Sequence, residues 1–186
     1  MIAILGAGGD IGNIGASGTG WQEVSTLIAR NGAGVSHAIG VGGRDLKAAV
    51  GGITTLMAID ALDRDPGTRQ VVLISKPPEA AVAKLVLERI ARSSKPFSIC
   101  FIGIDDMRVP ANATLSSDLR TTAENALAGK RIGWSGAAAS AAALGAGVAR
   151  GRNMVKGLFS GGAMFAAAHV FFRRACSEVA THFPAP

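Results

Sequence analysis

The chain has 186 residues and a formal net charge of +6, and 48% of its residues are hydrophobic while 17% are charged. This composition supports a buried core and excludes an intrinsically disordered chain. The two cysteines, Cys100 and Cys176, are too few and too distant for a disulfide framework, which favours a reducing, cytoplasmic location. The length fits one domain, or one domain with an additional piece.

Several classes of partner and cofactor fit the sequence poorly. The apolar stretch Gly157–Phe172 is shorter than the ~20 residues of a spanning helix, so we expect no membrane partner. Lysine and arginine never occur in runs longer than two, so we expect no nucleic-acid partner. The glycine-rich start lacks the G-x-G-x-x-G spacing of NAD-binding proteins, and the three histidines lack metal-ligand spacing. For Asp105-Asp106 we favour a solvated pair over a Mg²⁺ site.

Short apolar runs alternate with helical patterns over residues 10–130. This alternation is typical of βαβ units and predicts a three-layer α/β domain around a parallel sheet. The predicted strands are 11–16, 35–41, 71–74 and 97–102. The predicted helices are 21–30, 52–63, one opened by the prolines at 77 and 78, and 115–127.

The helical patterns carry more detailed expectations. Thr19 and Gln22 match a reciprocal N-cap, and Asn31-Gly32 a left-handed helix end. The helix at 52–63 is apolar nearly all round, which predicts that it is well covered. In the following helix the predicted core stripe is Val82, Leu85, Val86 and Ile90.

The composition changes after Gly129. Residues 131–154 are rich in alanine and glycine and indicate a linker or a helix of small residues. Residues 155–160 resemble a strand, which could supply a fifth strand, and Gly161-Gly162 precedes a helix near 163–179. One strand–helix unit cannot bury its own apolar face. Residues 155–186 therefore either begin a second, incomplete domain or dock on the first.

Two glycine-containing turns could bind an anion. Ser17-Gly18-Thr19 lies between a strand and a helix, where free backbone N–H groups and the helix dipole favour phosphate or carboxylate. Ser160, Gly161 and Gly162 repeat this arrangement before the last helix. An ordinary helix cap is the alternative for both turns.

Basic residues follow the second and third predicted strands. Gly43 and Arg44 come after 35–41, and Lys76 comes after 71–74. The carboxyl ends of parallel strands share one edge, so we expect these residues near Ser17, where arginine can grip a phosphate or carboxylate with two hydrogen bonds. The alternatives are an Arg44–Asp45 surface pair and a solvated Lys76.

A family resemblance rests on several of these segments together. They are I-G-x-x-G-A-S-G-T-G-x-Q-E-V at 11–24, G-V-S-H-A-I-G-V-G-G-R-D-L at 34–46, V-G-G-I-T at 50–54, V-L-I-S-K-P-P at 72–78 and F-S-G-G at 159–162. In this order the chain resembles FdrA-type proteins of the succinyl-CoA synthetase (ADP-forming acyl-CoA synthetase) superfamily.

The resemblance implies a flavodoxin-like domain, the second of three, in an acyl-CoA synthetase-type ligase or an oxamate carbamoyltransferase component. It implies that CoA binds to a preceding domain absent from this chain and that a second flavodoxin-like domain begins at F-S-G-G. It also implies that the turns Ser17–Thr19 and Ser160–Gly162 bind the anion. It also implies flanking domains or partner subunits, an oligomer, and a small anionic substrate.

The chain departs from the ligases at two positions. Residues 103–112 contain no histidine where the ligases carry a phosphohistidine, and Ser75-Lys76 stands where they carry an orienting glutamate. No catalytic residue is therefore assigned, and we expect this chain alone to be inactive. The alternative is a non-catalytic assembly or ligand-binding module.

Overall fold

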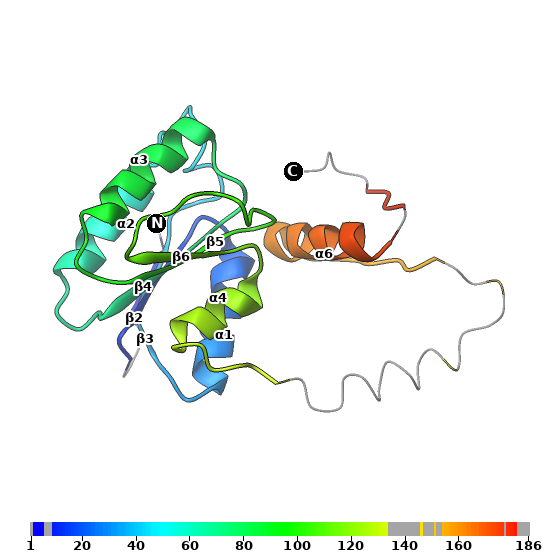
Figure 1. The fold of residues 1–186 in the computed structure, drawn as a ribbon, viewed down its shortest axis with the longest axis horizontal. Coiled ribbons are helices and arrows are strands. Elements are labelled where there is room, and N and C mark those ends of the chain that lie inside the picture. Colours follow the sequence, from blue (N-terminus) through cyan, green and yellow to red (C-terminus); the bar gives the residue numbers. More distant parts are fainter. Residues whose placement is uncertain are drawn as a thin grey trace.

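The computed structural model describes residues 2–5, 9–133, 146, 151, 154–176 and 178–181, and its centre is a six-stranded sheet (Figure 1). Residues 131–154, for which the sequence predicts a linker or a helix of small residues, lie almost entirely outside the described residues. The strands are β1 Ile2–Leu5, β2 Ile11–Gly15, β3 Val35–Gly40, β4 Gln70–Ser75, β5 Phe97–Phe101 and β6 Ala113–Ser116.

The strand order is β1-β3-β2-β4-β5-β6, and all neighbours are parallel except β1, which pairs with β3 in the antiparallel sense. When β1 is left out and the five parallel strands are renumbered in chain order, the order is 2-1-3-4-5, which is that of flavodoxin. In register, Gly15 of β2 lies between Gly40 of β3 and Ile74 of β4. The prediction of a parallel flavodoxin-like α/β domain is thereby confirmed.

The fifth parallel strand is β6, and the expectation that residues 155–160 supply it is wrong. The sequence predicts a helix that begins at residue 115, but residues 113–116 form a strand. Their sequence, Ala-Thr-Leu-Ser, lacks the apolar run that predicts a strand. They become a strand because they pair with the edge of β5, where Ile99 lies beside Leu115.

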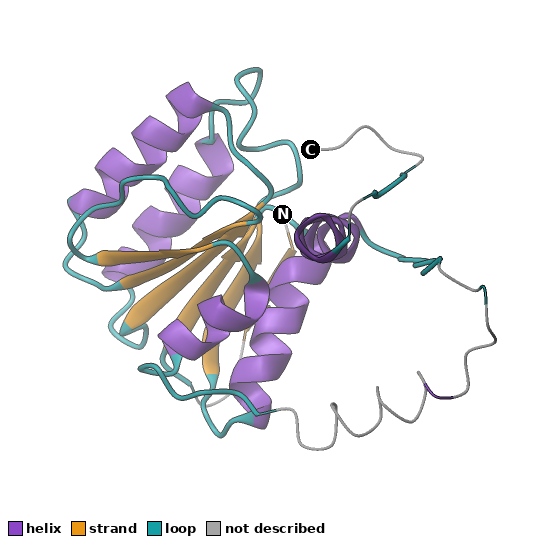
Figure 2. Cartoon of the chain, turned by 45° about the vertical axis from the view of Figure 1, so that its right-hand side comes forward, coloured by secondary structure: helices purple, strands orange, loops and turns teal. Residues whose placement is uncertain are grey.

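Helices cover both faces of the sheet (Figure 2). They are α1 Gly18–Arg30, α2 Ile53–Arg64, α3 Ala80–Ala91, α4 Leu119–Ala126 and α6 Gly162–Ala175. Among these, α1, α4 and α6 pack on one face, and α2 and α3 pack on the other. None of the helices in the described ranges has the length and apolar character required to cross a membrane.

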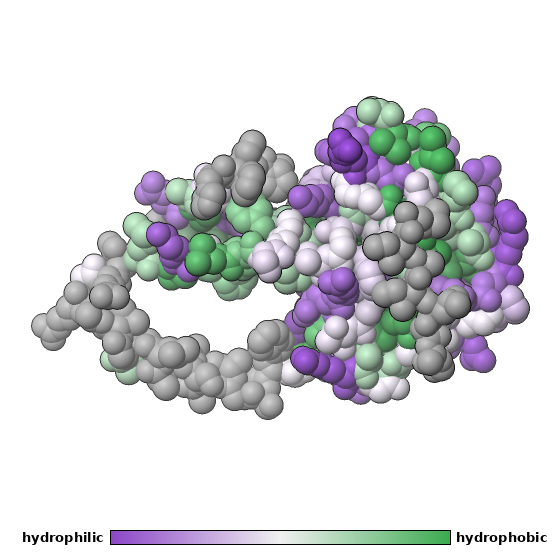
Figure 3. All heavy atoms as spheres, turned by 180° about the vertical axis from the view of Figure 1, so that it is seen from behind, coloured by the Kyte–Doolittle hydropathy of each residue, from purple (hydrophilic) through white to green (hydrophobic). Residues whose placement is uncertain are grey.

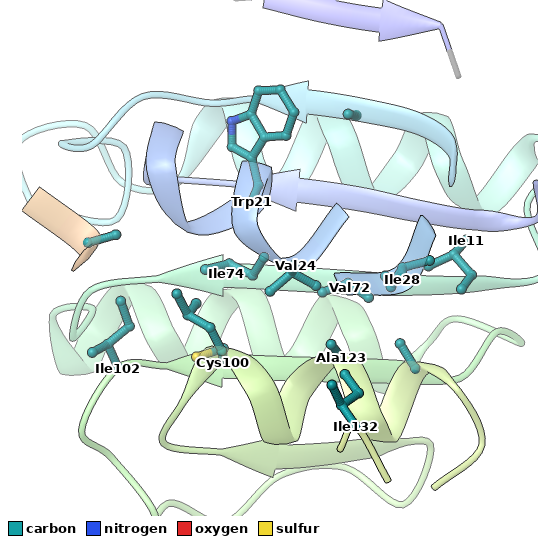
Figure 4. Packing of buried hydrophobic residues seen from close by; sticks show 14 of the residues in the cluster. Ile11, Trp21, Val24, Ile28, Val72, Ile74, Cys100, Ile102, Ala123 and Ile132 are labelled. Carbon is teal, nitrogen blue, oxygen red and sulfur yellow. The ribbon is translucent and has the colours of Figure 1, made fainter. Parts of the chain in front are cut away.

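Alternate residues of the central strands separate the core into two clusters. Val72 and Ile74 face α1 and α4, where Val24 and Ile28 cover them (Figure 4), whereas Leu73 faces α2 and α3. This double burial explains why β4 is continuously apolar. Cys100 lies in the first cluster, and burial raises the pKa of its thiol to about 12, so the thiol stays protonated.

The beginnings of two helices differ from the prediction. Helix α1 begins at Gly18, three residues earlier than expected, and its N-cap is Ser17, whose side chain makes no capping hydrogen bond. The predicted Thr19–Gln22 capping pair is therefore wrong, because Thr19 is already helical. Asn31 and Gly32, with φ +88°, end the helix as predicted. Helix α3 begins at Ala80, after the prolines rather than at them.

Two predictions of burial are wrong. Helix α2 is not well covered, because Ile53 and Met57 point to solvent, and Leu85 of α3 is half exposed instead of belonging to the core stripe. Thr55, Ala58, Ile59 and Leu62 provide the buried face of α2. A helix with apolar residues all round buries only the face that the sheet can reach.

The C-terminal helix docks on the domain. Ala163 and Ala166 of α6 are buried in the first core cluster, and Val170 lies so close to Gly103 that an added Cβ there would come within 2.9 Å of it. An ion pair of 3.0 Å joins Arg174 to Asp105. Residues 154–160, in contrast, form neither strand nor helix and are exposed. The helix therefore packs on the first domain without the strand expected before it.

Candidate functional site

The loops after β2, β3 and β4 meet at the carboxyl edge of the sheet. In the first loop, Ser17 is extended, with φ −144°, and turns the chain into α1. Within the described part of the chain, the backbone N–H groups of Gly18, Thr19 and Gly20 have no acceptor, and Trp21 is the first residue of the helix whose N–H is bonded, to the Ser17 carbonyl. The start of α1 thus presents unpaired donors at the positive end of a 13-residue helix.

The loop after β3 approaches this helix start closely. Gly42 has φ +94°, which favours glycine, and a Cβ added to Gly43 would lie 3.4 Å from the carbonyl oxygen of Ala16. The Arg44 side chain is exposed and forms no hydrogen bond or ion pair with any described residue.

Asp45 points into the protein. It is 3% exposed, and its carboxylate accepts hydrogen bonds from the backbone N–H groups of Thr54 and Thr55, at 3.0 and 2.8 Å, and from the Thr55 hydroxyl at 2.6 Å. Asp45 thereby satisfies free donors at the start of α2. The alternative of an Arg44–Asp45 surface pair is wrong.

Lys76, in the loop after β4, lies beside the first turn of α6. A Cβ added to Gly162 would be 2.9 Å from the Lys76 ammonium nitrogen. No described acidic residue forms an ion pair with Lys76. A cation at the positive N-terminal end of a helix is electrostatically unfavourable unless a negative group lies nearby.

The N-terminal ends of α1 and α6 are in contact. A Cβ added to Gly161, the N-cap of α6, would lie 2.5 Å from Thr19 Cγ2 and 2.9 Å from Thr19 Oγ1. Only glycine allows this approach without movement of Thr19. The structure therefore brings Thr19, Lys76, Gly161 and Gly162 together, with Ser160 exposed immediately before them.

A pocket of about 110 Å³ opens between the loops after β3 and β4. Its lining residues are Gly43, Leu46, Lys47, Ser75, Lys76 and Pro77. Lys47, which sequence reasoning did not single out, takes the place expected for Arg44. The turn in which the Lys47 N–H donates to the Arg44 carbonyl produces this, because it directs Asp45 and Leu46 inward and leaves Lys47 at the pocket.

Two other polar groups lie apart from this arrangement. His37 pairs with Leu5 and Gly12 along β3, and its Nδ1 is 3.3 Å from Asp65 Oδ2, in the loop before β4. Asp105 and Asp106 are both exposed, as expected for a solvated pair, and Asp105 also forms a surface ion pair with Arg174. In the described ranges, no three His, Cys, Asp or Glu side chains form a group suited to a metal ion.

A parallel sheet of order 2-1-3-4-5, covered by helices on both faces, defines the class of flavodoxin-like, or Rossmann-like, α/β domains. Within this class, the chain belongs to the CoA binding domain family, whose model matches residues 7–103. That match extends from just before β2 to just after β5. It is consistent with the succinyl-CoA synthetase-like superfamily.

The chain is also similar to a protein of Escherichia coli strain K12, the uncharacterized protein YahF. The two are 53% identical over 94 residues, which is 50% of this chain but 18% of YahF. The chain thus spans less than a fifth of the length of this curated relative. The match to the CoA-binding family thus lies within this chain, whereas the resemblance implied CoA binding by a preceding domain.

Proposed function

We propose that this domain binds the phosphate groups of CoA, or a smaller phosphate or carboxylate anion, where the N-termini of α1 and α6 meet. The single observation that carries the proposal is the position of Lys76. Its ammonium group lies at the start of α6 with no acidic partner among the described residues. An anion between Lys76 and the two helix ends would neutralise three sources of positive potential at once.

The residues present suit the anionic part of CoA. The unpaired N–H groups of Gly18, Thr19 and Gly20 supply directed hydrogen bonds, and Lys47 and Lys76 supply charge. The neighbouring pocket of about 110 Å³ shares Lys76 with this junction but is lined by no residue of α1 or α6; its volume suits a phosphate group rather than the whole cofactor, since pockets that enclose a drug-sized ligand measure roughly 300–1,000 Å³. Bound CoA would supply a thiol for acyl transfer, and the residues named here would hold its phosphates.

We further propose that the domain belongs to an FdrA-type component of an acyl-CoA synthetase-like ligase or an oxamate carbamoyltransferase. Residues 103–112 contain no histidine, and Ser75-Lys76 occupies the place of the orienting glutamate. The role we propose for the chain is therefore to bind and orient an anionic substrate without a phosphohistidine. Its catalytic partners would be flanking domains or separate subunits.

Calorimetric titration tests the binding proposal. We expect CoA, carbamoyl phosphate or inorganic phosphate to bind the wild-type chain, and Lys76→Met to weaken the affinity about 10-fold or more, because a charge-assisted hydrogen bond contributes ~1.5–3 kcal/mol. Arg44→Ala should have a smaller effect, since Arg44 does not line the pocket.

Lys130→Met is the matched control, because it removes the same charge from a lysine that donates to the Asn31 carbonyl at the C-terminal end of α1. Equal losses in Lys76→Met and Lys130→Met would indicate an effect of net charge alone. Absence of heat with all three ligands would contradict the proposal.

A turnover assay separates the enzyme component from a non-catalytic assembly module. The chain would be combined with a homologue from which this domain has been deleted, and formation of acyl-CoA or carbamoyl phosphate would be followed. Restored turnover that Lys76→Met abolishes supports the enzyme component. Binding without restored turnover supports the assembly module.

A further inference from the structure

Helix α6 is held on the domain by a small contact surface. Of its 14 residues, all of which the structure describes, three are buried, namely Ala163, Ala166 and His169. Two of these three contribute a single methyl group each. Figure 3 views the molecule from behind and shows α6 standing out from the body of the domain. Elements with few buried apolar contacts open at a low free-energy cost, so a ligand at one end of α6 can change how firmly it docks.

The start of α6 lies among positive groups. Phe165 is the first residue of the helix whose backbone N–H is bonded, to the Gly161 carbonyl, so the three donors before it are unpaired within the described part of the chain. The Lys76 ammonium nitrogen lies beside these donors, 2.9 Å from a Cβ added to Gly162. Neither α1 nor α6 has an acidic residue in its first turn. The two helix starts and Lys76 therefore repel one another and oppose the docking of α6.

An anion between these groups reverses the sign of the interaction. The negative charge attracts Lys76 and both helix starts at once, so it favours the arrangement in which α6 is docked. A ligand that interacts more favourably with one of two states shifts the equilibrium toward that state. By linkage, docking of α6 raises the affinity for the anion by the same factor.

We propose that α6 is a lid controlled by the anion, whose docking on α1 and on the loop after β5 strengthens when a phosphate group binds beside Lys76. This inference rests on the proposed function, because it concerns the same anion. Docking brings Gly161 against Thr19 at the site and Val170 against Gly103 beyond it. The docked lid thereby adds the free N–H groups of α6 to those of α1 and retains the ligand.

Hydrogen–deuterium exchange followed by mass spectrometry tests the coupling directly. We expect saturating inorganic phosphate to slow amide exchange in α6 about 5-fold or more, the lower end of typical coupling between two sites. The control is sodium chloride at the same ionic strength, which screens the repulsion to the same extent without a phosphate group. Helix α3, which packs on the opposite face of the sheet, should exchange equally in both samples.

The repulsion has a test that needs no ligand. Lys76→Met should slow exchange in α6 in chloride alone, because it removes the ammonium group beside the start of the helix, and phosphate should then slow it little further. Lys130→Met is the matched control, since it removes the same charge from a lysine bonded to the Asn31 carbonyl at the opposite end of α1. It should leave exchange in α6 unchanged.

The reciprocal effect is measured by calorimetry. Ala166 is 2% exposed and lies one turn beyond the start of α6, outside the anion site. Ala166→Phe should overfill the contact, displace α6 and weaken phosphate affinity about 5-fold or more. Ala175→Phe, at an exposed position of the same helix, should leave the affinity unchanged.

The outcomes separate this coupling from the proposed binding site. Phosphate that binds but leaves exchange in α6 unchanged would overturn the coupling and leave the site standing. Faster exchange in Lys76→Met in chloride alone would also overturn it, because the ammonium group would then stabilise docking. Absence of phosphate binding to the wild-type chain would reject the site, and the coupling with it.

Discussion

Asp45 shows how one residue can position a loop and a helix together. Its buried carboxylate accepts three hydrogen bonds from Thr54 and Thr55 and holds the start of α2 against the loop that carries Gly43 and Lys47. We expect Asp45→Ala to lower the free energy of unfolding by about 2–3 kcal/mol, because it removes a helix cap and leaves buried donors unpaired. Urea denaturation measures this. Asp105→Ala, which removes an exposed carboxylate, should cost less than about 1 kcal/mol. Equal losses in both variants would show that Asp45 has no such role.

Helix α6 shows that a small contact surface can join a distant segment to the domain. Ala163 is fully buried, and a Cβ added to Gly20 of α1 would lie 3.4 Å from the Ala163 Cβ. No space therefore remains for a larger side chain at position 163. We expect Ala163→Phe to overfill this contact, at a cost of about 1–3 kcal/mol, and to speed amide hydrogen exchange in α6 and at the start of α1. Ala175→Phe, on an exposed position of the same helix, should not change exchange there. If the two variants exchange alike, α6 is not held by this contact.

The stability of the whole molecule should depend on pH through Asp63, which joins α2, α3 and the segment before β5. Partial burial acts to raise the pKa of Asp63, but hydrogen bonds from Ser93 and Arg89, with the charges of Arg89 and Lys95, outweigh it and lower that pKa. A lowered pKa in the folded state stabilises the protein above the unfolded value of about 3.9, and this contribution is lost as the pH falls through the folded pKa. We expect Asp63→Asn to lower the free energy of unfolding by about 1–3 kcal/mol at pH 7, with the difference from wild type shrinking below pH 4. Chemical denaturation at pH 7, 5 and 3 measures it, and a difference independent of pH would contradict the assignment.

Local sequence patterns determined the four central parallel strands, the helices between them and the edge at which Ser17, Gly43 and Lys76 meet. They suffice because alternation of apolar runs with helices leaves few topologies, and parallel strands direct all their carboxyl ends to one side. Tertiary structure alone decided the rest. Residues 113–116 become a strand because β5 offers an unpaired edge, and Ile53, Met57 and Leu85 stay exposed because the sheet covers one face of each helix. Gly161 and Gly162 lie beside Thr19 and Lys76 because α6 packs against the domain formed by the earlier part of the chain. Lys47 lines the pocket because Asp45 turns inward. These outcomes depend on contacts between residues far apart in sequence, which no local pattern encodes.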